Sequence, residues 1–426
     1  MNLIFKIYLF LLIAIIYSPN LGAIDMKATQ WFYLSVLNTF FLAYALFNSK
    51  NFNFSKSIKH PLFITYGVFF LASIISTINA INLMISLERL TDLFSILITL
   101  GILILISKNS NVKFNYILIL LTFGLFLESL GSLNQYRQII SFSEFSLSDA
   151  NDIRGFYANK NITAAAIAFK LPFVIILMRR LKNNFMTVIG YLILVLASFT
   201  LLLLSARAVF LSISLCIFSL IIISIIQNRN DKNFIKLLFK RLKPFVLPII
   251  LATIIFNSIS QNTSSIKIDS RVSTIIQNED DESTSQRLRF YSHAVKQIAQ
   301  TPIIGAGIGN WKILSIKYDA KNMYSYVVPF FTHNDFLEIF AETGILGIVP
   351  FLSFFLLLFK YNIVSMSRSK HGSMFHLDPV YLFIPFIIYI VDVNLNFPLD
   401  RPSMQIHLLI YTFLIVSNLK FINEKK

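Results

Sequence analysis

The stretch LSISLCIFSLIIISII, residues 211–226, contains no charged side chain and decides the fold class. A helix that crosses the hydrocarbon core of a bilayer needs about 20 mostly apolar residues, and this run reaches that length with its flanks. Similar runs recur along the chain of 426 residues, of which 56% are hydrophobic and only 14% are charged. The mean hydropathy of +0.69 is too high for a soluble domain of this length. The sequence therefore predicts an all-α, polytopic integral membrane protein.

About twelve segments satisfy the length rule for a membrane-spanning helix. They lie near residues 3–18, 31–47, 61–79, 89–106, 114–133, 161–178, 185–204, 208–226, 244–259, 339–358, 379–392 and 403–419. We expect a single membrane domain, residues 1–426, with one large loop, residues 260–333, between the ninth and tenth spans. An alternative for the first segment is a cleaved signal peptide, with Lys6 as its basic start and Ala23 as its cleavage site.

Basic residues gather in every second connection between these segments. Arg179, Arg180 and Lys182 follow the sixth span, and a denser group lies between Arg229 and Lys243. Because connections rich in Lys and Arg stay in the cytoplasm, we expect both termini there and the large loop on the outer side. This anchoring accounts for most of the net charge of +16, and we expect no nucleic-acid partner.

The large loop contains one clear helical pattern. Leu288, Tyr291, Val295 and Ile298 recur at the spacing of one helix face, and Pro302 closes the pattern. We therefore expect an amphipathic helix that lies over the membrane domain. Loops of such length in a compact bundle are usually functional.

The sequence THNDFLE, residues 332–338, places a histidine, an amide and two carboxylates at the start of the tenth span. A charge at the centre of a bilayer costs about 2.5–3.5 kcal/mol, so such a cluster is kept only beside water, substrate or a partner. We expect Thr332 to be the N-cap, with Asp335 in a capping-box-like arrangement. A helix N-terminus disfavours imidazolium, which keeps His333 neutral and able to accept a proton. Glu338 is expected at the edge of this site.

Four parts of the sequence together resemble the O-antigen ligase family. They are RGFYANKN at residues 154–161, SAR at 205–207, the block from Arg287 to Trp311 and the segment from His333 to Gly347. Members of this family are membrane glycosyltransferases that take a glycan from undecaprenyl diphosphate at the outer face of the bacterial inner membrane. The resemblance implies a periplasmic active site, a lipid-linked glycan as donor, and lipid A-core or a similar glycolipid or glycan as acceptor. NFPLDRP, residues 396–402, also resembles the end of the family, and we expect it to shape the outer rim.

The chemistry of such a transfer needs positive charge for the departing diphosphate and a base for the acceptor hydroxyl. The sequence has no Asp-x-Asp pair, and Cys216 is its only cysteine, so we expect no metal site and no cofactor. Arginine replaces a metal ion because its planar fork binds phosphate oxygens in pairs. We therefore predict a metal-independent, inverting glycosyltransferase in which His333 is the base, and Arg154, Arg207 and Arg287 hold the diphosphate.

Each of these residues has a simpler alternative. Arg207 is also placed to extend to the membrane interface, Arg154 also fits an ordinary loop charge, and a histidine at an interface often only forms hydrogen bonds. Helix geometry places Arg287 at the edge of the apolar stripe and Arg289 almost opposite it, toward water. The further substrate contacts that we predict are Arg289, Asn159, Asn334 and Glu338.

Two other features allow more than one interpretation. The glycines at positions 305, 307 and 309 fit a phosphate-binding nest, but a tight turn after the loop helix is favoured. Lys170 lies deep in a predicted span, where we expect it to extend to the interface or to line the cavity.

The same donor chemistry serves a repeat-unit polymerase and a protein O-oligosaccharyltransferase, and the sequence does not identify the acceptor or the sugar. Polymerases tend to have two large outer loops, whereas this chain has one large and one modest loop, which favours a ligase. A lipid or polysaccharide transporter is the alternative from another class, since about twelve spans suit many carriers. A carrier should show related halves and several charges within spans, and we find no duplicated pattern here.

Overall fold

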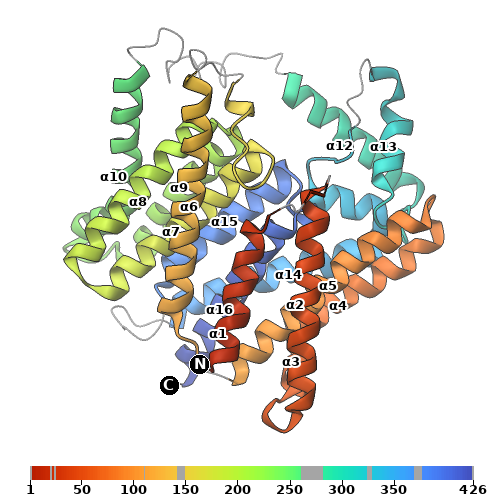
Figure 1. Ribbon diagram of the computed structural model, residues 1–426, viewed down its shortest axis with the longest axis horizontal. Coiled ribbons are helices and arrows are strands. Elements are labelled where there is room, and N and C mark those ends of the chain that lie inside the picture. Colours follow the sequence, from red (N-terminus) through yellow and green to blue (C-terminus); the bar gives the residue numbers. More distant parts are fainter. Residues whose placement is uncertain are drawn as a thin grey trace. The chain divides into compact units, whose positions relative to one another are not determined.

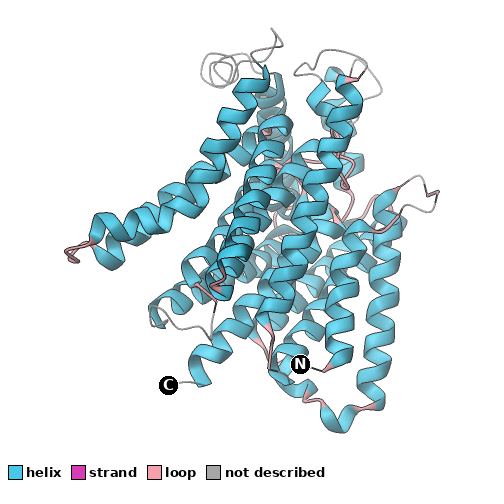
Figure 2. Cartoon of the chain, turned by 60° about the vertical axis from the view of Figure 1, so that its left-hand side comes forward, coloured by secondary structure: helices cyan, strands magenta, loops and turns pink. Residues whose placement is uncertain are grey.

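The structure is a computed structural model of residues 1–426, and it describes residues 2–19, 22–23, 25–109, 111–141, 149–260, 282–323, 329–368 and 377–424. In these residues all regular secondary structure is helical and no strand occurs, as Figure 1 and Figure 2 show. The predicted all-α class is confirmed. Residues 261–281 of the predicted large loop lie outside the described residues.

The chain divides into two compact units. The first contains Met1–Val112, Asp280–Ser367 and Val393–Lys426, and the second contains Lys113–Glu279 and Arg368–Asp392. Of the predicted site residues, the first unit carries Arg287, Arg289, His333, Asn334 and Glu338, and the second carries Arg154, Asn159 and Arg207.

Each unit contains long helices together with short helical turns. The first unit carries α1 (Leu3–Ala14), η1 (Ile15–Tyr17), α2 (Met26–Phe47), η2 (Ser49–Asn51), α3 (Phe54–Ile58), α4 (Pro61–Ser76), η3 (Thr77–Asn79), α5 (Leu83–Asn109), α12 (Glu282–Gln300), α13 (Trp311–Asp319), η5 (Ala320–Asn322), α14 (Asp335–Arg368), η6 (Pro398–Asp400) and α16 (Pro402–Glu424). The second carries α6 (Phe114–Ile140), η4 (Asp149–Asn151), α7 (Lys160–Leu181), α8 (Asn184–Leu204), α9 (Arg207–Asn228), α10 (Phe234–Ser260) and most of α15 (Pro379–Leu395).

Ten helices within the described residues are long and apolar enough to cross a membrane. They correspond to ten of the twelve predicted segments. The other two form the shorter apolar helices Leu3–Tyr17 and Pro379–Leu395. The ninth segment was predicted to begin near residue 244, but α10 begins at Phe234 and contains Pro244 and Pro248 inside it. Its basic first turns continue the helix because Lys and Arg are good helix formers with long, flexible side chains.

Lys170 is fully buried in the second unit and forms an ion pair. Its ammonium group donates to the two carboxylate oxygens of Glu128 on α6, at 2.7 and 2.9 Å, and to the hydroxyl of Tyr157 at 3.3 Å. Tyr157 also donates a hydrogen bond to Glu128. The expectation that Lys170 extends to the interface or lines a cavity is therefore wrong. A carboxylate partner offsets the cost of a charge at this depth, and Glu128 is a second charge that the sequence analysis overlooked.

The turn between α12 and α13 is joined by hydrogen bonds to a break inside α14. The break lies at Gly344, whose φ of 62° and ψ of −164° are not helical. There the amide of Ala306 donates to the carbonyl of Ala341 at 3.0 Å, and the amide of Ile345 donates to the carbonyl of Pro302 at 2.8 Å. The glycine-rich segment is thus the tight turn that the sequence favours, and it fixes α12 against α14.

α12 is amphipathic as predicted, but its buried face differs from the predicted one. Leu288 and Val295 are 62% and 55% exposed, whereas Ala294 and Gln297 are 0% and 3% exposed. Figure 1 shows α12 and α13 side by side, and Gln297 accepts a hydrogen bond from the Tyr318 hydroxyl of α13 at 2.9 Å. The prediction failed because a polar side chain with a partner on a neighbouring helix can be buried, and the apolar pattern does not show this.

Candidate functional site

Side-chain hydrogen bonds cap the N-terminus of α14, but the capping residue is not the predicted one. The helix begins at Asp335, and the side-chain oxygen of Asn334 accepts from the amide of Leu337 at 3.1 Å, so Asn334 is the cap. Glu338 accepts from the amide and the hydroxyl of Thr332 at 2.9 and 3.1 Å. The prediction of Thr332 as N-cap is wrong because its hydroxyl donates to the carbonyl of Asn334 at 2.7 Å. His333 therefore lies in a turn before the helix, and Glu338 closes that turn.

Asp335 connects this turn to the segment that follows α15. Its carboxylate accepts from the amide of Leu399 at 2.8 Å, and its side chain is buried at 3% exposure. A buried carboxylate that accepts a backbone hydrogen bond holds two chain segments together. Asp335 is therefore a structural tie rather than part of a capping box.

His333 is fixed by aromatic rings and by a tyrosine hydroxyl. Its ring stacks on Phe290 of α12, with 6.4 Å between centroids and 15° between planes, and it meets Phe397 edge-on at 5.3 Å. The hydroxyl of Tyr291 donates to the carbonyls of His333 and Asn394 at 3.2 and 3.0 Å. The backbone of His333 has a φ of 58°, a left-handed conformation that is uncommon for a residue with a side chain. Such a conformation persists where its surroundings hold it, and it is frequent at functional sites.

The environment of His333 keeps the imidazole neutral. Burial, and to a smaller extent the nearby charge of Arg287, lowers its pKa from 6.5 to about 4. Among the described residues, the Nδ1 atom is buried and has no hydrogen-bond partner. The neutral state predicted from the helix N-terminus is thus explained by burial and by an arginine.

The two arginines of α12 have different partners. Arg287 acts electrostatically on both His333 and Tyr291. Arg289 donates two hydrogen bonds to the carboxylate of Asp319 on α13, at 2.8 and 3.3 Å. The Arg289 side chain is 34% exposed and that of Asp319 only 4%, so Arg289 reaches water only in part and also pairs with a buried carboxylate. Arg289 turns toward α13 because a buried carboxylate is there to pair with it.

The predicted site residues of the second unit lie at the ends of its helices. Arg154 is 59% exposed and lies 3.3 Å from Asp152, and Arg207 is exposed at the first position of α9. Asn159 caps α7, with its side-chain oxygen accepting from the amide of Asn161 at 2.9 Å. In this unit the predicted residues thus supply two exposed cations and a helix cap.

A comparison with protein families bears on the residues of both units. Residues 192–352 match the family model described as O-antigen ligase. The chain carries an O-antigen ligase domain. The family resemblance seen in the sequence is confirmed, and the domain includes Arg207, Arg287, Arg289 and His333, whereas Arg154 precedes it. A comparison with curated proteins finds no match.

Phe397, which lies outside residues 192–352, also contacts His333, and the sequence analysis missed this segment's role. The ring of Phe397 stacks on Phe331 at 4.1 Å, and the guanidinium of Arg401 lies 4.9 Å from the centre of the Phe397 ring. Burial lowers the pKa of Arg401, and within the described part of the chain its Nε atom has no hydrogen-bond partner. The signal for these residues was the likeness of residues 396–402 to the end of the family.

Proposed function

We propose that the chain is an O-antigen ligase-like glycosyltransferase, which moves a glycan from undecaprenyl diphosphate to a hydroxyl of lipid A-core or a similar glycolipid. The observation that carries the proposal is the state of His333. It is a neutral imidazole within the O-antigen ligase domain, fixed between Phe290 and Phe397 and beside the cation of Arg287. A base next to a guanidinium is the pair of groups that displacement of a diphosphate requires.

The proposed step forms one bond and breaks one. The acceptor oxygen attacks the anomeric carbon of the donor sugar while His333 takes the acceptor proton. The bond between that carbon and the diphosphate oxygen breaks, and the departing undecaprenyl diphosphate keeps the electron pair. Arg287 stabilises the negative charge on this leaving group. Attack on the face opposite the leaving group inverts the anomeric centre.

The donor itself activates the base in this proposal. With a pKa of about 4, His333 is a weak base in the free protein. A bound diphosphate is anionic and offsets the positive charge of Arg287, so the pKa of His333 rises in the complex. The base therefore becomes effective only when the donor is present.

The remaining predicted contacts complete the proposal. Arg154, Arg207, Arg289, Asn159, Asn334 and Glu338 are proposed substrate contacts. We propose a metal-independent reaction because arginine supplies the positive charge. The positive-inside distribution of Lys and Arg supports a periplasmic site in the bacterial inner membrane, with both termini in the cytoplasm.

The test uses the purified full chain in detergent with an undecaprenyl-diphosphate-linked glycan and a glycolipid acceptor. Replacing the base in His333→Ala should lower the rate of transfer by about 10²–10⁴-fold. The matched control is His293→Gln, because His293 of the same unit stacks on Tyr318, 5.8 Å away, instead of on the rings around His333. Circular dichroism and thermal unfolding verify that both variants are folded.

The products separate this proposal from its alternatives. Glycan on the glycolipid supports the ligase. Extension of the donor glycan itself indicates a polymerase, glycan on protein hydroxyls indicates a protein ligase, and movement across vesicles without a new covalent bond indicates a carrier. If the His333→Ala variant transferred glycan at the wild-type rate, the proposed role of His333 as the base would be refuted.

A further inference from the structure

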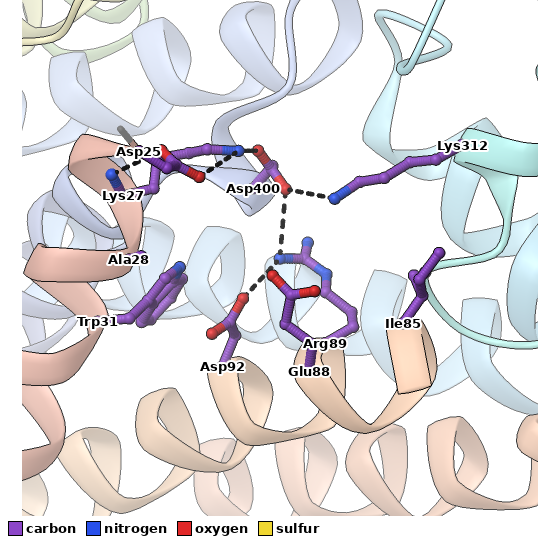
Figure 3. Close-up of a pocket in the computed structure, with 11 residues that line it drawn as sticks. Asp25, Lys27, Ala28, Trp31, Ile85, Glu88, Arg89, Asp92, Lys312 and Asp400 are labelled. Carbon is purple, nitrogen blue, oxygen red and sulfur yellow. Dashed lines mark hydrogen bonds and ion pairs between the residues drawn. The ribbon is translucent and has the colours of Figure 1, made fainter. Parts of the chain in front are cut away.

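A polar pocket lies in the first unit, and its lining residues have no part in the step proposed above. It has a volume of about 70 Å³ and is lined by residues at the start of α2, on α5, at the start of α13 and in η6. Figure 3 shows Lys27 and Lys312 reaching Asp400 from opposite sides, with Arg89 also directed at it. The cations lie 2.6, 3.9 and 3.9 Å from the Asp400 carboxylate, for Lys27, Arg89 and Lys312 respectively.

Arg89 lines this pocket and has a buried hydrogen-bond donor without a partner among the described residues. The residue is only 9% exposed. Its Nη1 atom lies 3.7 Å from Asp92 and 3.9 Å from Asp400, and in the described residues it has no hydrogen-bond partner. A buried guanidinium N–H without a partner costs free energy, so a ligand atom that accepts a hydrogen bond at this point would be stabilised.

The charges of the lining favour a neutral ligand over an anion. Three cations and four carboxylates line the pocket, the carboxylates being Asp25, Glu88, Asp92 and Asp400. Although burial disfavours the ionised form of Asp400, the charges of Arg89, Lys27 and Lys312 hold its pKa below the ordinary value. The ionised Asp400 is therefore shared by the three cations, and with Asp25, Glu88 and Asp92 the lining holds more carboxyl groups than cations. A phosphate or diphosphate would have to displace this carboxylate and approach the other three.

The remaining groups suit a polyol. Glu88, which is exposed, and Asp92 present acceptors, while Arg89 and Lys312 present donors, so hydroxyl groups that both donate and accept can be satisfied together. Trp31 adds a flat indole at one side of the pocket, as Figure 3 shows. The C–H face of a sugar ring packs against such a surface, because an indole is apolar over its ring.

Aromatic rings connect this pocket to His333. The ammonium of Lys27 lies 5.9 Å from the centre of the Phe331 ring, which stacks on Phe397 at 4.1 Å. Phe397 in turn meets the His333 ring at 5.3 Å. A glycan bound with one ring in the pocket would thus extend toward the histidine along surfaces of the same unit.

We propose that the pocket formed by Trp31, Glu88, Arg89, Asp92 and Lys312 is a saccharide subsite, which binds one neutral sugar unit of a glycan substrate. This inference rests on the proposed function, because it supplies the reason for a sugar to be present. The sugar unit comes either from the donor glycan or from the acceptor, and kinetics distinguishes the two.

Tryptophan fluorescence of the full chain in detergent micelles provides a direct binding test. The chain has two tryptophans, and Trp311 is 1% exposed, so Trp31 is the one that a ligand in the pocket reaches. The probes are the methyl glycosides of glucose, galactose, mannose and N-acetylglucosamine, with inorganic pyrophosphate as the anionic comparison. We expect at least one glycoside to change the fluorescence saturably and pyrophosphate to cause no change, and we expect Trp31→Phe to remove the response.

Two further variants and one control test the polar lining. Glu88→Gln and Lys312→Gln should each weaken glycoside binding by about 5-fold or more, since each removes a charge-assisted hydrogen bond. The control is Lys317→Gln, because Lys317 is an exposed lysine on the same helix, α13, and does not line the pocket. Binding of pyrophosphate without glycosides, the absence of any glycoside response, or equal effects of Lys312→Gln and Lys317→Gln would each overturn the inference.

Transfer kinetics assigns the sugar and separates the two proposals. In the transfer assay Glu88→Gln and Lys312→Gln should raise KM about 5-fold or more with little change in kcat, for the donor if the donor glycan fills the pocket and for the acceptor otherwise. Glycoside binding by a wild-type chain that transfers nothing would refute the proposed function and leave the subsite. Transfer by the wild type with unchanged KM in both variants would refute the subsite alone.

Discussion

The ammonium of Lys170 lies 2.7 Å from a carboxylate oxygen of Glu128, and both side chains are fully buried. The two residues lie on neighbouring helices of the second unit, α7 and α6, in segments long and apolar enough to cross a membrane. Removing one partner of a buried pair leaves the other charge without compensation, which costs more than removing both.

Lys170→Met should therefore destabilise the second unit by about 3–5 kcal/mol, and Glu128→Leu should also destabilise it. The double variant Lys170→Met with Glu128→Leu should regain a large part of this stability, because no uncompensated charge remains. Thermal unfolding in detergent measures the three variants. A double variant as unstable as the sum of the single ones would show that the two side chains do not act as a pair.

The contact between the glycine-rich turn and α14 leads to a second prediction. Gly305 and Gly344 have φ values of 79° and 62°. A Cβ atom added at Gly305 would lie 2.3 Å from the backbone of Glu342, and one at Gly344 would lie 2.3 Å from the backbone of Ile303. Gly305→Ala and Gly344→Ala should each lower the thermal unfolding temperature strongly, since backbone strain and a backbone clash act together.

The control for these glycines is Gly67→Ala on α4. A Cβ atom there meets nothing within 4 Å, and alanine favours a helix more than glycine does. Gly67→Ala should therefore leave the unfolding temperature unchanged or raise it slightly. If Gly305→Ala left the unfolding temperature unchanged, as Gly67→Ala is expected to do, the described close packing of the turn against α14 would be refuted.

The spans could be predicted from the sequence because hydropathy is a local property. Each long apolar run, such as residues 211–226, contains its own signal, and ten helices of sufficient length lie where it predicts them. Helix ends were harder to predict: α10 begins at Phe234 because its basic turns continue a helix that the apolar rule starts later.

The predictions that failed concern residues whose partners lie far away in the sequence. Asp335 binds the amide of Leu399 instead of capping its own helix, and Gln297 is buried because Tyr318 donates to it. His333 was identified from its place beside a span, but the rings of Phe290 and Phe397 that hold it come from other segments. Such contacts follow from the fold rather than from any spacing along one element.

The ion pair between Arg289 and Asp319 makes a prediction about the role of Arg289. If this arginine mainly holds α12 against α13, Arg289→Gln and Asp319→Asn should reduce transfer by similar factors and lower stability by about 1 kcal/mol, as partly exposed pairs do. A double-mutant cycle on thermal unfolding measures their coupling. If Arg289 instead binds the donor, Arg289→Gln should reduce kcat/KM far more than Asp319→Asn does.

The influence of Arg287 on His333 predicts a change in the pH dependence of transfer. Because the base must be neutral, kcat/KM of the wild type should fall only as the pH drops through about 4, the pKa of His333 in the free protein. Arg287→Gln removes a positive charge that disfavours imidazolium, so the pKa of His333 rises, although burial still holds it below 6.5, and activity is lost at higher pH than in the wild type. The kcat/KM of Arg287→Gln is also lower at every pH, since Arg287 is proposed to stabilise the leaving diphosphate.

Arg289→Gln is the control and should leave the acidic limb in place, because Arg289 pairs with Asp319. If the acidic limb of Arg287→Gln stayed near pH 4, the charge of Arg287 would have no influence on the pKa of the base.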